Sequence, residues 1–188
     1  GAGKAITDVL TGKVNPSGRL PETFPNKLRS DLAYPGNGWY VEYYEKENVG
    51  YRYYDRHPEE ICYPFGHGLS YSTFHYHDPK VKVQKNSVEV EFQLTNVSET
   101  DGYEVVQIYI GKTTSTVRRA EKDLKAFRKV FVKAGQTVRV QFFLQKEDFA
   151  YYNVMLGRWI TESGEYRIFI AASARDIRLE DRVVLEGN

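Results

Sequence analysis

The clearest pattern in this sequence is an alternation of apolar and other residues with a period of two. One series starts at Val88 and ends at Leu94, and a glutamate or glutamine stands between each pair of apolar residues. A second series starts at Val138 and ends at Leu144. Successive side chains of a β-strand point to opposite faces. Each series therefore predicts a strand with one face in a core and the other in water.

More short strands are predicted in this half of the chain, separated by turn signals. The turns are indicated by Asp101-Gly102, Ala134-Gly135 and Ser163-Gly164, because glycine adopts the backbone conformations of tight turns. Residues 147–152 predict a single helical turn. Short strands at this spacing predict a mainly β fold, an immunoglobulin-like antiparallel β-sandwich. The further strands are expected at 105–110, 127–132, 166–171 and 177–185.

The first part of the chain has a different pattern. Ile6, Val9 and Leu10 lie at helical spacing and predict a helix over residues 2–10. So short a helix is unstable alone, and its apolar stripe therefore predicts a partner surface. Prolines and glycines interrupt residues 15–36 so often that a regular element is excluded there. We expect an extended connector.

The charge and the cysteine content exclude some functions. The 26 basic and 25 acidic residues leave a net charge of +1, and their dispersal gives no basis for binding nucleic acid or an anionic membrane. Cys62 is the single cysteine and cannot form an internal disulfide, which favours a reducing compartment. We expect a cytoplasmic protein, with a secreted or periplasmic location as the alternative. The Cys62 thiol is expected to be buried and inert.

Three motifs in the first half follow one another in a characteristic order. Residues 15–21 read Asn-Pro-Ser-Gly-Arg-Leu-Pro, residues 49–55 read Val-Gly-Tyr-Arg-Tyr-Tyr-Asp, and residues 64–74 read Pro-Phe-Gly-His-Gly-Leu-Ser-Tyr-Ser-Thr-Phe. Together they resemble the C-terminal part of family 3 glycoside hydrolases. Residues 101–109 and 173–179 are similar to that family's fibronectin-III-like domain.

The resemblance implies a division of the chain into three parts. Residues 1–30 would be the C-terminal remnant of an α/β sandwich domain, 31–78 a tyrosine-rich connector, and 79–188 a fibronectin-III-like β-sandwich domain. The sequence starts inside the family-like helix and without an initiator methionine. We therefore expect a fragment, a nicked product or one chain of a split enzyme.

The resemblance also implies an activity for the whole protein, most like that of a β-glucosidase. Such an enzyme removes terminal β-linked glucose from a β-linked glucoside or oligosaccharide, with retention and without a metal or organic cofactor. In this family both catalytic carboxylates lie upstream of the residues present here. We therefore expect no catalytic residue in this chain, which would be inactive alone and would clamp the missing catalytic domains, in the same chain or a second one. The alternative is a carbohydrate-binding or spacer module.

The connector is unusually rich in aromatic residues. Seven of the fifteen tyrosines lie between Tyr34 and Tyr54, together with Trp39. Rings at this density need a surface to pack against. One interpretation places them in the seam between domains. The other places some of them in a sugar-binding wall, where aromatic faces stack on pyranose rings and a guanidinium donates to hydroxyls. The substrate-binding candidates are Tyr51, Arg52 and Tyr53.

Other candidates for chemistry are weaker. His75 and His77 are spaced to share one strand face, but two ligands are a poor metal site, and we predict no metal. Carboxylates in the tyrosine-rich segment are expected to be solvated or paired with cations, as surface acids usually are. These carboxylates are Glu42, Glu45, Glu47 and Asp55.

The third motif predicts a tight corner. Gly66 and Gly68 indicate backbone that needs a positive φ or a close approach. Phe65 and Tyr71 are predicted to be buried anchors that hold the connector on the sandwich.

Overall fold

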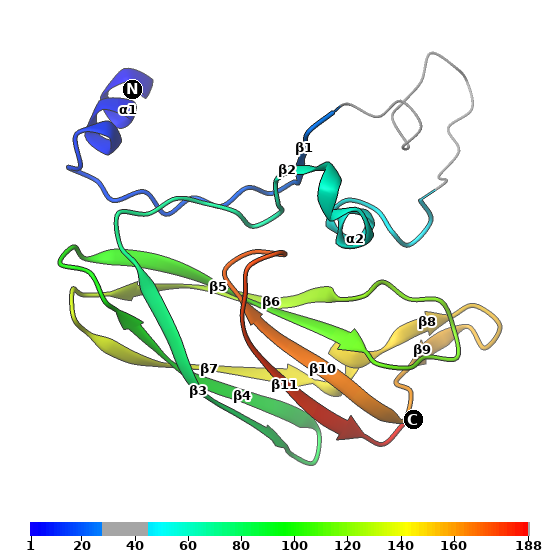
Figure 1. Cartoon of the computed structure of the whole chain (residues 1–188). Coiled ribbons are helices and arrows are strands. Elements are labelled where there is room, and N and C mark those ends of the chain that lie inside the picture. Colours follow the sequence, from blue (N-terminus) through cyan, green and yellow to red (C-terminus); the bar gives the residue numbers. More distant parts are fainter. Residues whose placement is uncertain (28–44, 188) are drawn as a thin grey trace.

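The computed structural model describes residues 1–27 and 45–187 (Figure 1). The expectations about Tyr34, Trp39 and Glu42 lie outside these residues. The helical elements are α1 (Ala2–Leu10), α2 (Tyr51–Arg56) and the 3-10 helices η1 (Pro58–Glu60) and η2 (Lys146–Phe149). The strands are β1 (Phe24–Pro25), β2 (Ile61–Tyr63), β3 (Phe74–Val83), β4 (Ser87–Asn96), β5 (Gly102–Lys112), β6 (Asp123–Val132), β7 (Thr137–Gln145), β8 (Tyr151–Asn153), β9 (Arg158–Ile160), β10 (Gly164–Ala171) and β11 (Ile177–Leu185).

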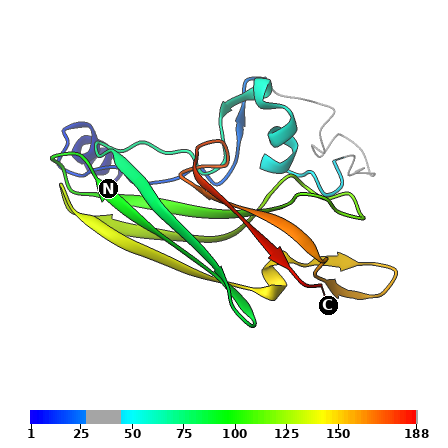
Figure 2. The same ribbon diagram turned by 60° about the horizontal axis from the view of Figure 1, so that its bottom comes forward.

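Two antiparallel sheets packed face to face form the main body (Figures 1 and 2). One has four strands in the order β11-β10-β5-β6, and the other has three in the order β3-β4-β7. Every pairing within them is antiparallel. The predicted antiparallel β-sandwich is confirmed.

The two alternating series meet in the three-stranded sheet. Val88 lies opposite Leu144, and Phe92 lies opposite Val140. All four side chains are at most 2% exposed, and they share one core with Ile108 of the facing sheet. Burying an apolar side chain of this size contributes about 1.5–3 kcal/mol. The alternation therefore supplies the contact that holds the sheets together.

Strand β5 departs from the expected pattern of one core face and one wet face. Val106 and Ile108 point into the sandwich core, but Gln107 and Tyr109 on the opposite face are only 3% and 0% exposed. Tyr109 belongs to a second apolar cluster, against which Phe65 of the preceding segment packs. The outer face of β5 is dry because the segment that leads into β3 crosses it (Figure 1).

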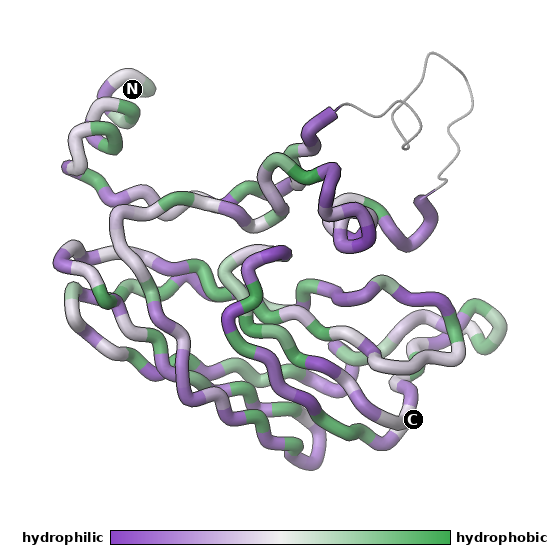
Figure 3. Tube along the Cα trace, in the orientation of Figure 1, coloured by the Kyte–Doolittle hydropathy of each residue, from purple (hydrophilic) through white to green (hydrophobic). Residues whose placement is uncertain are grey.

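Helix α1 has the bounds that the sequence predicts. It has no buried residue, and Ile6 and Leu10 are 60% and 75% exposed. Figure 3 shows apolar positions along this isolated helix. The hydroxyl of Tyr71 donates a hydrogen bond to the carbonyl oxygen of Val9 over 2.8 Å. The described residues thus leave the apolar stripe uncovered. None of the described helices has the length and apolar character needed to cross a membrane.

Gly66 and Gly68 shape the predicted corner for different reasons. Gly66 has a φ of +79°, a region that residues with a Cβ rarely adopt. The φ of Gly68 is ordinary, but an added Cβ would clash with the carbonyl oxygen of Gly18. Two backbone hydrogen bonds close the corner, from Leu20 N to the carbonyl of His67 and from Gly66 N to the carbonyl of Leu20, both 2.8 Å long. The sequence predicts a positive φ or a close approach at each glycine. Gly66 has the positive φ, and Gly68 has the close approach.

Two predictions about burial are wrong. Tyr71 is 50% exposed, because its hydroxyl reaches outward to α1. Cys62 is also exposed, because it lies in a two-stranded sheet whose other strand is the two-residue β1. Phe65 is half-buried, with its ring stacked on Tyr51 at a centroid distance of 4.9 Å.

Strand β3 begins at Phe74, before the alternation that is visible from about residue 79. The rings of His75 and His77 stack at 5.2 Å, so these residues share a face as the sequence predicts. A bulge follows His77, and Asp78 has a φ of +52°. The bulge shifts the alternation, which explains why the first part of the strand is hard to recognise.

The hairpin of β8 and β9 is not predicted from the sequence. Tyr152 lies opposite Trp159, and their rings make an edge contact at 5.6 Å. Met155 at the tip is 90% exposed. Strands of three residues are too short for a period of two to be visible. The helical turn predicted over residues 147–152 is present as η2, but it ends at Phe149, and residues 151–152 belong to β8.

Candidate functional site

Tyr51 and Arg52 lie at the start of α2, which follows Gly50. Gly50 has a φ of +62° and a ψ of −132°, a conformation that glycine adopts readily. This turn places α2 next to the beginning of β6 (Figure 1). We call the resulting contact the α2 seam; it consists of Tyr51, Arg52 and Asp55 with Lys122, Asp123 and Leu124.

Arg52 is engaged by the sandwich. Its Nε donates to Oδ1 of Asp123 over 2.5 Å, and its guanidinium lies 5.0 Å from the centroid of the Tyr51 ring. Burial is the largest single influence on the pKa of Arg52 and lowers it, but the hydrogen bond to Asp123 and the neighbouring acidic groups together outweigh burial and raise the pKa. Arg52 therefore stays charged and pairs a connector residue with a strand residue.

Tyr51 fills the centre of the seam. Its hydroxyl oxygen accepts a hydrogen bond from the backbone N–H of Leu124 over 2.9 Å. Its ring stacks on Phe65 and meets the edge of Tyr109 at 5.8 Å. Burial raises the pKa of Tyr51, so the phenol is neutral. The ring is thus enclosed by protein on two sides.

Asp55 and Lys122 form a buried ion pair, which is the third contact of the α2 seam. The two side chains are 1% and 8% exposed. Burial raises the pKa of Asp55, while the hydrogen bond from Lys122 and its charge oppose the shift. The second oxygen, Oδ2, has no hydrogen-bond partner among the described residues. The sequence predicts a solvated or paired Asp55; it is paired, and its burial was not foreseen.

Tyr53 points to a different neighbourhood from Tyr51 and Arg52. Its ring stacks on His57 at 4.3 Å and meets the edge of Tyr54 at 5.1 Å. Its hydroxyl donates to Oε2 of Glu60 over 3.4 Å. The structure therefore brings Tyr51 and Arg52 together and places Tyr53 with η1.

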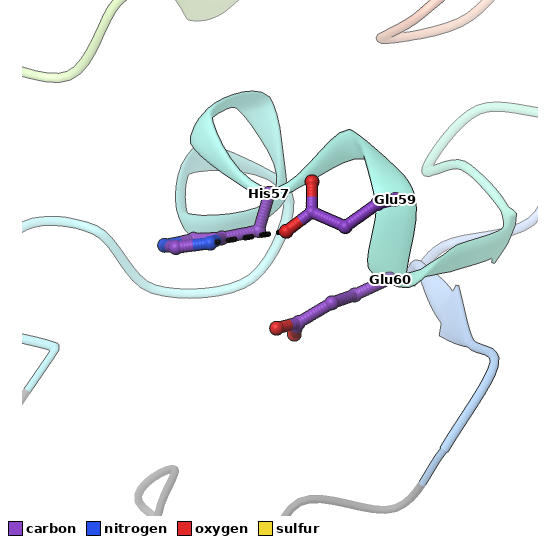
Figure 4. A group of neighbouring side chains, drawn as sticks. All are labelled: His57, Glu59 and Glu60. Carbon is purple, nitrogen blue, oxygen red and sulfur yellow. Dashed lines mark ion pairs between the residues drawn. The ribbon is translucent and has the colours of Figure 1, made fainter.

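Donor atoms that could hold a metal lie beside Tyr53. His57, Glu59 and Glu60 each offer one ligand atom, and these atoms lie within 4.8 Å of one another (Figure 4). Nδ1 of His57 is 3.6 Å from Oε1 of Glu59. The His57 and Glu59 side chains are 41% and 68% exposed. Open surface groups of this kind usually bind water and mobile ions, so the cluster carries no assignment.

The seam as a whole joins two segments of the chain. Both of its carboxylates, Asp55 and Asp123, are held in ion pairs, so neither is free to act as an acid or a base. Glu47 in the same segment pairs with Arg118 over 2.9 Å. Sequence reasoning missed Lys122 because a lysine in a loop carries no signal of a buried partner.

The chain belongs to glycosyl hydrolase family 3 and corresponds to the C-terminal part of its members. The family model described as the glycosyl hydrolase family 3 C-terminal domain matches residues 1–71, and the fibronectin type III-like domain matches residues 104–174. Relatives and solved structures of this family match nearly the whole chain. The resemblance that the sequence motifs indicate is thus confirmed.

Thermostable beta-glucosidase B of Acetivibrio thermocellus is 49% identical, over 96% of this chain and 25% of the relative. An exo-alpha-(1->6)-L-arabinopyranosidase of Bifidobacterium breve is 40% identical, over 99% of this chain and 25% of the relative. The crystal structure of a Bifidobacterium adolescentis GH3 beta-glucosidase superposes with a TM-score of 0.91 at 41% identity, covering 99% of this chain and 28% of that one. The chain thus spans about a quarter of the length of the curated relatives it matches.

Proposed function

We propose that this chain is the structural C-terminal portion of a retaining β-glucosidase, in which it clamps the catalytic domains. The uncovered stripe of α1 carries this proposal. Ile6 and Leu10 are exposed on a helix with no buried residue, and a helix of this length needs tertiary packing to persist. The catalytic part of the enzyme is the partner that would cover it.

A second uncovered surface supports the same role. Tyr103 lies opposite Phe131 in neighbouring strands, with ring centroids 4.9 Å apart. By the period of two, Tyr103 shares the outer face of β5 with Gln107 and Tyr109, which the connector covers. Tyr103 and Phe131 are each 43% exposed, and Phe127 on the edge strand β6 is 70% exposed. Exposed aromatics that continue a covered face favour an interdomain contact.

The substrate is proposed from the relatives. Most of those named are beta-glucosidases, and a structure of beta-glucosidase 3B from Thermotoga neapolitana is a complex with glucose. We infer that the whole enzyme hydrolyses terminal β-linked glucose. Because arabinopyranosidases are also among the relatives, the sugar that the whole enzyme releases has to be identified by assay. A carbohydrate-binding or spacer module is the alternative, and it would leave α1 without a partner.

The 188-residue chain is expected to hydrolyse no aryl β-glucoside, even at high protein concentration. The seam carboxylates are locked in ion pairs, and this chain's share of the enzyme is structural. Release of the aryl group is compared with that by the complete enzyme. Turnover above buffer that disappears in a Glu45→Gln variant would place the chemistry within this chain and overturn the proposal.

Replacing Arg52 by lysine in the complete enzyme is expected to lower the melting temperature and leave KM unchanged. Lysine retains the charge but loses the Nε–H that bonds Asp123. Arg118→Lys is the matched control, because Arg118 is 62% exposed and makes a surface pair, which contributes little. A raised KM with an unchanged melting temperature would instead place Arg52 in the sugar-binding wall.

A further inference from the structure

The first and third motifs and the two stretches that resemble the fibronectin-III-like domain converge on one cavity of about 190 Å³. Arg19 comes from the first motif, His67 to Phe74 from the third, and Glu104 from β5. Ser173 and Asp176 come from the loop between β10 and β11, and Arg178 from the start of β11. The seam accounts for the second motif, but nothing described so far accounts for this cavity. The lining is mainly polar and consists of Arg19, His67, Gly68, Ser70, Ser72, Thr73, Phe74, Glu104, Ala172, Ser173, Asp176 and Arg178.

The charges of the cavity balance. Nη2 of Arg19 donates to Oε1 of Glu104 over 2.9 Å, and these side chains are 11% and 6% exposed. Nη2 of Arg178 donates to Oδ2 of Asp176 over 2.7 Å. An anion would meet the two carboxylates, and a cation would meet the two guanidinium groups. The lining therefore disfavours a charged ligand of either sign.

One polar group beside Glu104 is not satisfied by the protein. Nε of Arg19 is buried and has no hydrogen-bond partner among the described residues, whereas the buried hydroxyl of Tyr76 lies beside the Glu104 carboxylate and interacts with it. Tyr76 stands next to this cluster, because the Arg178 guanidinium lies 5.7 Å from its ring. Native proteins rarely leave such groups unpaired, and those that remain mark sites of bound water, an ion or function.

An uncharged molecule with many hydroxyls fits these properties. The hydroxyl groups of Ser70, Thr73 and Ser173 line the cavity beside charged donors and acceptors, which make the stronger hydrogen bonds. His67 also lines the cavity, and Phe74, which is 6% exposed and belongs to the sandwich core, closes its inner side. The volume corresponds to about six molecules of liquid water, which suits a single pyranose ring.

We propose that this cavity is a non-catalytic site for one uncharged sugar ring, held between Glu104 and Arg178. The site goes beyond the structural role of the chain, since it would let the C-terminal part of the enzyme bind a sugar away from the chemistry.

The test uses D-glucose with two tryptophan variants. Thr73 is exposed and lines the cavity, so Thr73→Trp should fill it. Val97 is 59% exposed and donates its backbone N–H to the carbonyl of Thr73, but it does not line the cavity. Val97→Trp is therefore the matched control. Saturation-transfer NMR of the 188-residue chain should give a glucose signal in the parent and Val97→Trp chains and at least a tenfold weaker signal in Thr73→Trp.

Crystals of the complete enzyme soaked in D-glucose provide the second measurement, which does not depend on the folding of the separate chain. The expected result is a sugar ring within hydrogen-bond distance of Glu104 and Arg178, absent in Thr73→Trp. Water alone in the cavity would overturn the proposal. So would a sugar seen only at crystal concentration, with no signal in solution from a folded chain, or equal signals from the two tryptophan variants.

Discussion

Replacing Asp55 by alanine is expected to lower the free energy of unfolding of the chain by about 3–5 kcal/mol. The substitution leaves Lys122, which is 8% exposed, as a buried charge without its counter-ion. Neither the lysine side chain nor its charge can reach water without disturbing the α2 seam. Urea denaturation followed by tryptophan fluorescence measures the loss.

Two controls separate the buried charge from lost packing. The double variant Asp55→Leu with Lys122→Met removes both charges and keeps apolar volume, so it should recover most of the stability. Glu180→Ala breaks an ion pair with Arg167 in which the Glu180 and Arg167 side chains are 34% and 42% exposed. This substitution should lower the free energy of unfolding by at most about 1 kcal/mol. Equal losses in the single and double variants would contradict the charge argument.

Gly68→Ala is expected to cost about 3 kcal/mol, although φ at this position is ordinary. The new Cβ would meet the carbonyl oxygen of Gly18 and Cδ of Arg19, and the first of these is backbone that cannot turn aside. The corner would open, and the segment before β3 would lift from the outer face of β5. Denaturation midpoints and the rate of tryptic cleavage within residues 45–73 measure both effects.

Gly18→Ala is the matched control for this substitution. Gly18 belongs to the same contact, but an added Cβ there would have no atom within 4 Å. Its effect should stay within about 0.5 kcal/mol. If the two alanine variants were equally stable, the close approach would not be what selects glycine at Gly68.

The sandwich could be predicted because its core strands carry their burial in a local pattern. Where a strand is covered on both faces, the same pattern misleads. Gln107 stands at a position that alternation assigns to water, yet it is 3% exposed. Its Nε2 donates to the carbonyl oxygens of Gly66 and Ala172 over 3.2 and 2.8 Å. Those partners come from distant parts of the chain, and no window of sequence contains them.

The candidate site could be predicted only in part, again because its contacts join residues that are far apart in the sequence. The density of aromatic residues indicated that the segment around Tyr51 and Arg52 packs against something. It did not indicate what, because Asp55 and Lys122 are 67 residues apart and neither residue type suggests burial. The errors at Tyr71 and Cys62 have the opposite origin. Residue types that are usually buried lie here on segments with little protein above them.

The exposed Cys62 gives the chain a native attachment point for a single probe. It is the one cysteine of the sequence, and it lies in β2, on the bridge between the sandwich and the strand β1 that continues from α1. A thiol-reactive dye would label this place uniquely, without engineered residues. Its emission would then report, in real time, on the proposed assembly of catalytic domains on this chain.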